Sequence, residues 1–136
     1  MGATAESADA TALAELLSIG QGATVMEIGY DSDTDDLVAE AVVAGSGEPM
    51  VDEDYDGVVD AIMLWWREDD GDLTDALVDA KPPLADNGVI WLLTPKFGRD
   101  GALEPADVAD AASTSGLRRT TTVTLKNWQA VRLVAR

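Results

Sequence analysis

The sequence predicts an α/β fold in which helices cover both faces of a mostly parallel sheet. Residues 57–66 and 88–94 are apolar almost throughout, as expected of parallel strands that are buried on both faces. Segments with helical spacing alternate with these strands along the chain. Two further β-type segments, residues 119–125 and 129–135, are separated by only three residues, which predicts a closing antiparallel hairpin. At 136 residues the chain has the length of one domain, and we expect residues 1–136 to form it.

Hydrophobic spacing predicts the helices, and short apolar or β-branched runs predict the strands. Helices are expected over residues 7–17, 33–44, 72–80 and 104–116. Strands are expected over residues 24–28, 57–66, 88–94, 119–125 and 129–135, with a short edge strand near residues 48–51. The segment 57–66 is predicted to be the central strand, and residues 1–6 are expected to be disordered.

Residues that favour helix starts and stops set the expected helix boundaries. The second helix has an Asp or Thr available as its N-cap, and it is expected to end at Gly45. Asp72 is placed to cap the third helix, and the Pro-Pro pair at residues 82–83 prevents further turns. Pro105 suits the first turn of the fourth helix, and Gly116 terminates that helix.

The composition excludes several kinds of chemistry. The chain has no cysteine and no histidine, which excludes disulfides, thiolate nucleophiles, imidazole bases and zinc sites built from those ligands. It is an acidic protein, and its formal net charge of −17 opposes binding to the phosphate backbone of nucleic acids. No apolar run approaches the roughly 20 residues of a membrane-spanning helix, and residues 1–10 lack the pattern of a secretion signal. We therefore expect a cytoplasmic protein that binds no membrane and, unless a local basic patch overrides the overall charge, no nucleic acid.

Four local patterns resemble class I S-adenosylmethionine methyltransferases, whose sheets are parallel except for a reversed last strand. They are LLSIGQGATVMEIG for the first helix and strand, DYDGVVDAIMLWW and PPLADNGVIWLLT for two later strands, and SGL before the hairpin. The runs VDEDYDGVVDAIMLWWREDDGDLTDALVDA and GVIWLLTPKFGRDG resemble more closely an uncharacterised actinobacterial domain-of-unknown-function family. The first resemblance implies a Rossmann-like, methyltransferase-like fold, and the second implies no activity.

Two features depart from the methyltransferase pattern. A glycine-rich turn lets backbone N–H groups approach the cofactor, but here Asp31 and Asp33 replace the second and third glycines, and only Gly29 remains. Each carboxylate would repel the cofactor's carboxylate by about 1 to 4 kcal/mol, partly offset by the sulfonium and ammonium groups. We interpret Asp31 and Asp33 instead as the cap and charged start of the following helix. Residues 30–56 are also too few for the expected elements, so the fold should be shortened by about one βα unit.

A ligand site, if the chain has one, is expected at the carboxyl edge of the sheet, where open α/β sheets bind ligands. The candidate cofactor-binding residues are Glu27, Gly29, Tyr30, Glu48, Trp65, Lys96 and Arg99. Glu48 has the spacing of a ribose-binding acid, but it also suits a solvated loop. Of the adjacent Trp65 and Trp66, one should be core and the other should line a crevice or a partner surface. Lys96 and Arg99 could hold an anion or a partner's carboxylate, or pair with the chain's own Asp residues.

No constellation for metal binding or catalysis is expected. DEDYDG at residues 52–57 resembles the first half of a calcium loop, but the twelfth position, which must be a bidentate Glu, is Met63. No side chains pair as a nucleophile with its activator or as an acid with a base, so we predict no catalytic residue and no metal ligand. Asp60 interrupts an apolar strand, where it marks either a site or the solvated beginning of the strand.

These observations favour a non-catalytic, methyltransferase-like module that acts as a binding or regulatory domain through protein contacts, with no cofactor. The alternative is an enzyme or sensor, such as an S-adenosylmethionine-dependent methyltransferase, that binds S-adenosylmethionine or a nucleotide in the carboxyl-edge crevice. A third hypothesis is a homodimer formed through an exposed Trp or through the edge of the hairpin. Fold class by itself does not decide among them.

Overall fold

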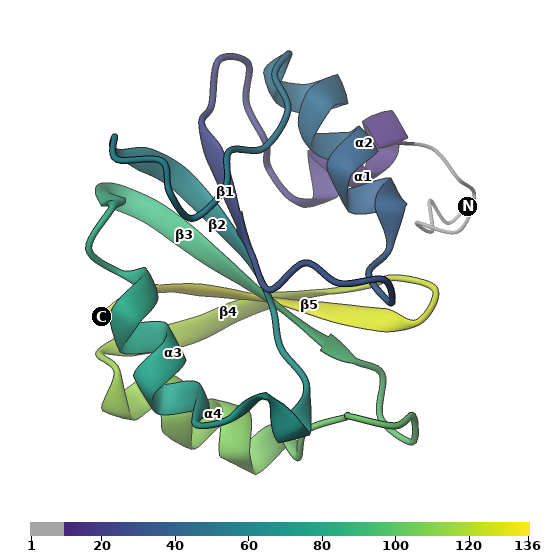
Figure 1. Cartoon of the computed structure of the whole chain (residues 1–136), viewed down its shortest axis with the longest axis vertical. Coiled ribbons are helices and arrows are strands. Elements are labelled where there is room, and N and C mark those ends of the chain that lie inside the picture. The colour runs from purple at the N-terminus through teal and green to yellow at the C-terminus, as the bar shows by residue number, and fades with distance from the viewer. Residues whose placement is uncertain (1–9) are drawn as a thin grey trace.

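A computed structural model describes residues 10–136 as a five-stranded sheet between two layers of helices (Figure 1). The helices are α1 (Ala10–Leu16), α2 (Asp36–Ser46), the short 3₁₀ helix η2 (Glu68–Asp70), α3 (Leu73–Ala80) and α4 (Pro105–Thr114). The strands are β1 (Val25–Ile28), β2 (Val59–Trp65), β3 (Leu84–Pro95), β4 (Leu117–Thr124) and β5 (Trp128–Ala135). The disorder expected for residues 1–6 and the helix start expected at residue 7 lie outside the described residues.

The sheet order is β1-β2-β3-β5-β4, with β1, β2 and β3 parallel and β5 antiparallel to both of its neighbours. This arrangement confirms a mostly parallel α/β sheet that ends in an antiparallel hairpin. The prediction that residues 57–66 form the central strand is wrong. Instead, β3 lies in the middle, because the hairpin pairs with β3 through β5 and places two strands on its far side.

The segment between β1 and β2 is short and contains a single helix, α2. The edge strand expected near residues 48–51 is reduced to one bridge between Met26 and Val51. The Val51 N–H donates to the Val25 carbonyl at 2.8 Å, and the Glu27 N–H donates to the Val51 carbonyl at 2.9 Å. These bonds occupy the outer edge of β1 without a further strand, in agreement with a fold shortened by about one βα unit.

Helix boundaries follow capping chemistry, with two differences in α2. The helix begins after an Asp35 N-cap, whose carboxylate accepts a backbone N–H, and it continues through Gly45 to a left-handed Gly47. The predictions that it begins at residue 33 and ends at Gly45 are therefore wrong. Glycine is needed inside the helix at this point, because a Cβ on Gly45 would lie 2.7 Å from the Ile19 carbonyl oxygen.

The other two predicted helix starts are confirmed. Asp72 is the N-cap of α3 and accepts the Asp75 N–H. Pro105 stands at the start of α4, where its missing N–H has no helical partner to lose.

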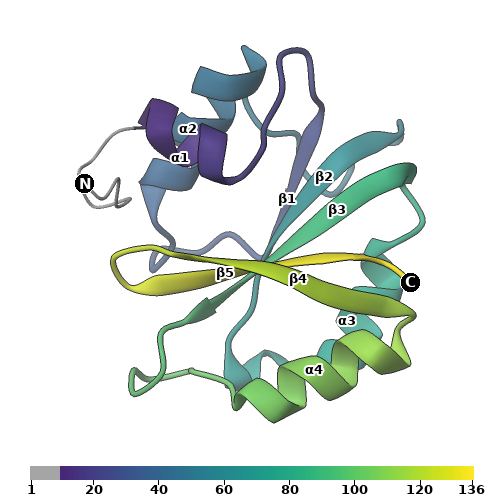
Figure 2. The same cartoon turned by 180° about the vertical axis from the view of Figure 1, so that it is seen from behind.

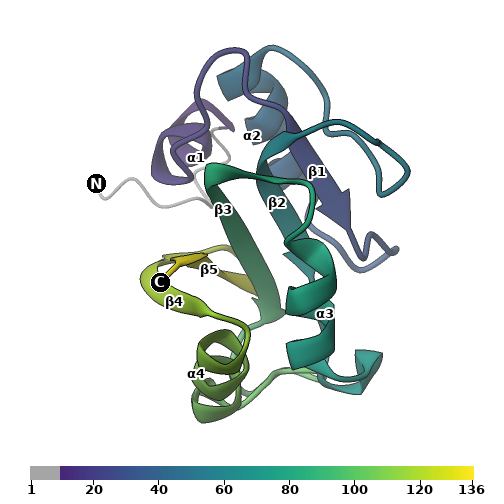
Figure 3. The same cartoon turned by 90° about the vertical axis from the view of Figure 1, so that its left-hand side faces the viewer.

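Two apolar layers pack against the sheet, one on each face (Figures 2 and 3). The helices α1 and α2 cover one face, where the core includes Trp65, Trp91 and Trp128, all nearly fully buried. The helices α3 and α4 cover the other face above residues such as Ile62. Successive residues point to opposite faces, so Trp65 belongs to the first core layer, while Trp66 packs partly buried against the second.

Asp60 lies at the exposed beginning of β2. Its carboxylate accepts the Thr24 N–H at 2.9 Å, and its own N–H donates to the Thr24 carbonyl at 2.8 Å. Its place favours the solvated beginning of the strand over a ligand site. Between residues 10 and 136, no helix has the length and hydropathy to cross a bilayer.

Candidate functional site

The carboxyl ends of β1 and β2 meet at Gly29, the first residue after β1. Gly29 has a φ of +86°, which favours glycine, and a Cβ at this position would collide with the carbonyl oxygen of Trp65. The glycine therefore allows the turn after β1 to lie directly against the end of β2. This close approach brings the acidic turn at residues 31–33 next to Arg67, which follows β2.

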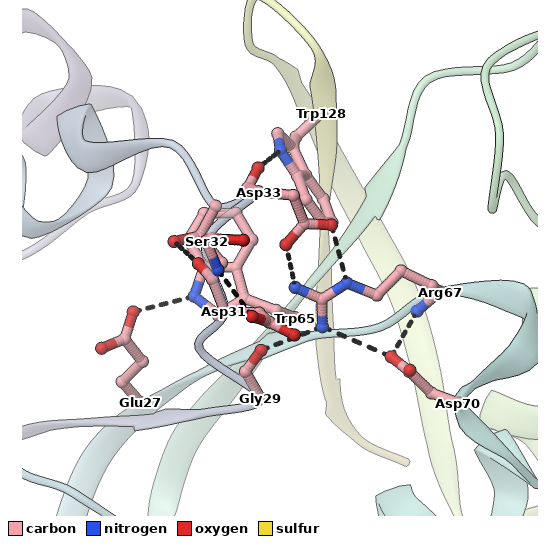
Figure 4. Close-up of polar contacts among 10 residues, drawn as sticks. Glu27, Gly29, Asp31, Ser32, Asp33, Trp65, Arg67, Asp70 and Trp128 are labelled. Atoms are coloured by element: carbon pink, nitrogen blue, oxygen red, sulfur yellow. Dashed lines mark hydrogen bonds and ion pairs between the residues drawn. The ribbon is translucent and has the colours of Figure 1, made fainter.

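Arg67 bridges the two strand ends (Figure 4). Its Nε and Nη2 donate to the two carboxylate oxygens of Asp33 at 3.1 and 2.6 Å, which makes a bidentate ion pair. Its Nη1 donates to the Gly29 carbonyl at 2.9 Å and lies 3.3 Å from Asp70 Oδ2. The same Asp70 oxygen accepts the Arg67 backbone N–H at 2.9 Å. The Arg67 side chain is only 13% exposed, so the centre of this network is largely shielded from water.

Two tryptophans support Arg67 and the turn. The guanidinium lies over the Trp128 ring, 5.2 Å from its centroid, in a cation–π contact. The Trp128 indole N–H donates to the Asp33 carbonyl at 3.1 Å, and its ring meets that of Trp65 edge to face at 4.8 Å. The Trp65 indole N–H donates to Glu27 Oε2 at 2.9 Å. We call this set the Arg67 cluster: Glu27, Gly29, Asp33, Trp65, Arg67, Asp70 and Trp128.

The ion pair changes the titration of both partners. The hydrogen bonds from Arg67 hold the pKa of the Asp33 carboxyl below its ordinary value of 3.8, despite an opposing effect of partial burial. The hydrogen bonds to Asp33 likewise raise the pKa of Arg67. Both groups are therefore charged at neutral pH, and the ion pair is fully formed there.

The two acidic residues of the turn do not act as predicted. Asp31 Oδ1 accepts the Ser32 N–H at 2.7 Å within the turn, and Asp33 binds Arg67. The interpretation of Asp31 and Asp33 as the cap and charged start of α2 is therefore wrong, because the cap is Asp35. A bidentate guanidinium is a stronger partner for the Asp33 carboxylate than one backbone N–H at a helix end.

Four of the predicted ligand residues lie together at the carboxyl edge of β1 and β2. Glu27, Gly29 and Trp65 belong to the Arg67 cluster. Tyr30 is the residue after Gly29, and 61% of its surface is exposed. Trp65 is 1% exposed, so it packs in the core and does not line an accessible crevice. Its neighbour Trp66 lines a hollow between α3 and α4 on the other face of the sheet.

Glu48 does not join this group. It follows α2 beside Ser46, whose carbonyl accepts the Gly22 N–H just ahead of β1. Glu48 therefore lies near the amino end of β1, whereas Gly29 lies at the carboxyl end. Its side chain is exposed, as in the interpretation of this residue as a solvated loop acid.

Lys96 and Arg99 follow β3 at the same carboxyl edge. The Lys96 backbone N–H donates to the Asn127 carbonyl at 3.1 Å, at the tip of the hairpin. Arg99 is exposed and lines an open hollow of about 640 Å³ together with Asp33 and Trp128. Within residues 10–136, neither Lys96 nor Arg99 forms an ion pair with a carboxylate.

The acidic loops do not converge on a metal. Across the described part of the chain, no group of three or more acidic side chains is arranged to hold a metal ion. In the loop at residues 52–57, Asp52 Oδ1 instead accepts the Asp54 N–H at 3.0 Å, a bond within the loop itself.

The candidate cofactor-binding residues do not include three members of the cluster, namely Arg67, Asp70 and Trp128. Arg67 has one usable signal, because it is a basic residue at the carboxyl end of a buried strand in a chain whose first turn is acidic. Trp128 has none, because its bond to Asp33 joins residues 95 positions apart.

The model of a protein family described as a protein of unknown function (DUF3052) matches residues 14–136. The chain belongs to this family. Uncharacterized proteins of Mycobacterium tuberculosis and Mycobacterium bovis are each 48% identical to it over 134 residues, which is 98% of this chain and 85% of theirs. The resemblance to an uncharacterised actinobacterial family is thereby confirmed.

Several solved structures share the fold. The pyocyanin biosynthetic protein PhzM matches 97% of this chain with a TM-score of 0.70 and 12% identity, and the chain spans only 56% of PhzM. A ribosomal protein L11 methylase of Lactobacillus delbrueckii subsp. bulgaricus has a TM-score of 0.65 and 15% identity, over 93% of this chain and 78% of its own. A SAM-dependent methyltransferase of Aquifex aeolicus has a TM-score of 0.60 and 15% identity, over 94% and 90%. These likenesses show the fold alone, and they confirm a methyltransferase-like, Rossmann-like domain.

Proposed function

We propose that this domain is a non-catalytic, methyltransferase-like module that acts as a binding or regulatory domain through contacts with other proteins. The Arg67 cluster is the observation that supports this proposal. Its polar groups at the carboxyl edge are bonded to one another, with Asp33 on Arg67 and Glu27 on the Trp65 indole. A small ligand at this edge would have to break those contacts before it made its own.

S-adenosylmethionine does not fit these residues well. The Arg67 side chain crosses from the end of β2 to the turn after β1, which is the turn that approaches the cofactor in the resembling family. Asp31 and Asp33 add negative charge where the cofactor's carboxylate would lie. Asp33 already forms an ion pair with Arg67, so the cofactor's sulfonium would have to displace that arginine before it could interact with the Asp33 carboxylate. We therefore derive no methyl-transfer step and propose that the domain uses no cofactor.

Isothermal titration calorimetry of S-adenosylmethionine into the full chain tests the proposal. We expect no binding heat at cofactor concentrations up to about 1 mM, which bounds the binding free energy at about −4 kcal/mol. Micromolar binding together with methyl transfer to any acceptor would contradict it. Arg67→Ala and Arg119→Ala form a matched pair, because cofactor binding gained only in Arg67→Ala would identify Arg67 as the excluding group.

A second candidate function is favoured by the open hollow beside the cluster. Arg99 and Asn127 line this space at the carboxyl edge, and Arg99 has no carboxylate partner within residues 10–136. We propose, as the alternative, an enzyme or sensor that binds a nucleotide, or S-adenosylmethionine held outside the Arg67 cluster. A thermal-shift screen with nucleotides should then stabilise the wild type but not Arg99→Ala. A screen without any thermal shift would remove the basis for this alternative.

A further inference from the structure

Positive charge is concentrated at one end of this chain. Residues 111–136 contain five Lys and Arg residues and no Asp or Glu, whereas residues 1–110 contain four Lys and Arg residues and all 26 Asp and Glu residues. The net charges of the two segments are +5 and −22, which together give −17. We call the five the basic hairpin residues, because they lie on or next to β4 and β5: Arg118, Arg119, Lys126, Arg132 and Arg136.

None of these five residues forms an ion pair with a carboxylate in the described part of the chain. Four of them are exposed, and Arg132 is half-buried. Between residues 10 and 136 the ion pairs involve Arg67 alone, so no basic hairpin residue is paired with a carboxylate there. Arg132 Nη1 donates to Thr120 Oγ1 at 3.1 Å and Arg136 Nη1 donates to Ser113 Oγ at 2.9 Å, and both acceptors are neutral. Because these basic side chains have no carboxylate partner among the described residues, they remain available to a negatively charged outside group.

The strand β4 is the outer strand of the sheet, and among the described residues no strand lies beyond it (Figure 2). Arg118 is paired with Val134 and Arg119 with Leu133, so the two arginines point to opposite faces and both flank the open edge. A register shift between Arg119 and Thr122 makes this edge irregular. Regular pairing with a long added strand is therefore interrupted, and recognition must come mainly from the arginine side chains.

We propose that the basic hairpin residues bind an extended acidic segment of a partner protein, which lies along the open edge of β4. This inference rests on the proposed function as a binding module, and it names the surface and the chemistry of the partner. Four of the five residues are arginine, whose planar guanidinium binds a carboxylate through two parallel hydrogen bonds. The segment must be short, because the acidic remainder of the protein repels any acidic chain that extends beyond the hairpin.

Charge also disfavours two other occupants. A nucleic acid longer than the hairpin would carry its phosphates past the basic residues and onto the acidic remainder of the surface. A second copy of this chain would bring together two molecules that each carry a net charge of −17.

Fluorescence anisotropy with a labelled peptide of eight residues, the length of β4, tests the proposal. The peptide alternates Glu-Glu with Thr-Thr, so that Glu side chains lie on both faces of the extended segment and can meet both Arg118 and Arg119. A version with Gln in place of Glu serves as its uncharged counterpart. We expect the Glu peptide to bind the full chain at about 0.05 M salt and to lose about tenfold or more in affinity at about 0.5 M, because screening shortens the reach of the charges. The Gln peptide should not bind.

The double variant Arg118→Glu/Arg119→Glu should weaken peptide binding about tenfold or more. The matched control Lys96→Glu/Arg99→Glu makes the same change in net charge on the loop after β3, at the other end of the hairpin, and should weaken it less than about threefold. Circular dichroism shows whether each variant is folded. Equal losses in the two folded variants, or no peptide binding by the wild type, would overturn the proposal.

Two further measurements test the other two possible occupants of this surface, a nucleic acid and a second copy of this chain. Tighter binding of a single-stranded DNA oligonucleotide than of the Glu peptide would contradict a protein partner. A molecular mass that rises with concentration in light scattering, and falls again in Arg118→Glu/Arg119→Glu, would assign the surface to self-association and also contradict the proposal. The calorimetric titration with S-adenosylmethionine does not depend on the peptide, oligonucleotide or light-scattering results. A failure of the hairpin proposal is therefore distinguishable from a failure of the proposed function.

Discussion

The carboxyl edge of β1 and β2 and the hairpin of β4 and β5 both present arginine, but only the first region matches it with acid. Arg67 is 13% exposed and bonded to Asp33, Asp70 and the Gly29 carbonyl. Arg118 and Arg119 are exposed and have no carboxylate partner within residues 10–136. The arginine of the first region is already paired with carboxylates of this chain. The arginines of the second region are not, so an outside group can neutralise their charge.

The place where a fold usually binds ligands and the place where this chain has unpaired charged groups are therefore different. Open α/β sheets place a crevice at the carboxyl ends of their strands. Whether the crevice can be used depends on the side chains there, and at the ends of β1 and β2 in this chain they already bind one another. Two arginines without a carboxylate partner in the described part of the chain, Arg118 and Arg119, lie far along the sequence on the outer strand β4.

The largest effect should come from Gly29→Ala, which breaks the contact on which the first region depends. The new Cβ would meet the Trp65 carbonyl oxygen at a φ of +86°, so the free energy of unfolding should fall by about 3 kcal/mol. Gly22→Ala is the matched control, since Gly22 has a φ of +81° but nothing within 4 Å of a new Cβ. That control should cost about 1 kcal/mol. Urea unfolding followed by tryptophan fluorescence measures both, and equal losses would show that the contact with β2 does not matter.

A smaller effect is expected from Arg67→Ala, and its comparison with Arg118→Ala tests the difference between the two regions directly. The change leaves Asp33 and the Gly29 carbonyl without their donor, and we expect a loss of about 2 kcal/mol. This is less than for a fully buried pair, because Asp33 is 53% exposed. Arg118→Ala should change stability by less than about 0.5 kcal/mol, since Arg118 has no ion-pair partner to lose within residues 10–136. Similar losses in the two variants, measured by urea unfolding, would remove the distinction between the regions.

The smallest effect is expected from Asp33→Asn, with a loss of about 1 kcal/mol at neutral pH. Because the pKa of Asp33 is lowered in the folded state, its contribution is fully present above the ordinary value of 3.8 and is lost as pH falls through the lowered value. The difference in unfolding free energy between wild type and Asp33→Asn should therefore shrink toward zero as the pH falls below 3.8 and through the lowered pKa of Asp33. A difference that does not shrink on acidification below pH 3.8 would mean that the ion pair with Arg67 is not its source.

Much of the fold could be predicted because its signals are local. Continuous apolar runs mark β2 and β3. Asp72 marks a helix start through its bond to the nearby Asp75 N–H, and Pro105 marks another because its ring suits the first helical turn. The end of α2 could not be predicted, because Gly45 serves the close contact with Ile19 and not the helix end. The position of β3 in the middle of the sheet depends on its pairing with β5, which no local pattern reveals.

The candidate site was less predictable, because its contacts are distant in sequence. The need for Gly29 follows from the strand-to-turn pattern, but its neighbour Arg67 is 38 positions away and the bond between Asp33 and Trp128 spans 95. Glu48 has the right spacing for a carboxyl-edge acid in a longer fold. In this shortened fold Glu48 is followed by a single bridge between Met26 and Val51 and not by a full strand, so Glu48 lies near the amino end of β1.

The central claim is that Arg67 closes the carboxyl edge from within. The most direct measurement is the ¹H–¹⁵N signal of the Arg67 Nε–H, assigned with Arg67→Lys, during a titration with S-adenosylmethionine. We predict a resolved, slowly exchanging signal that does not move as the cofactor is added, because the Nε–H stays bonded to Asp33. A signal that shifts together with the backbone amides of Gly29 and Asp33 would contradict the claim, since it would show that the cofactor replaces the contacts of Arg67.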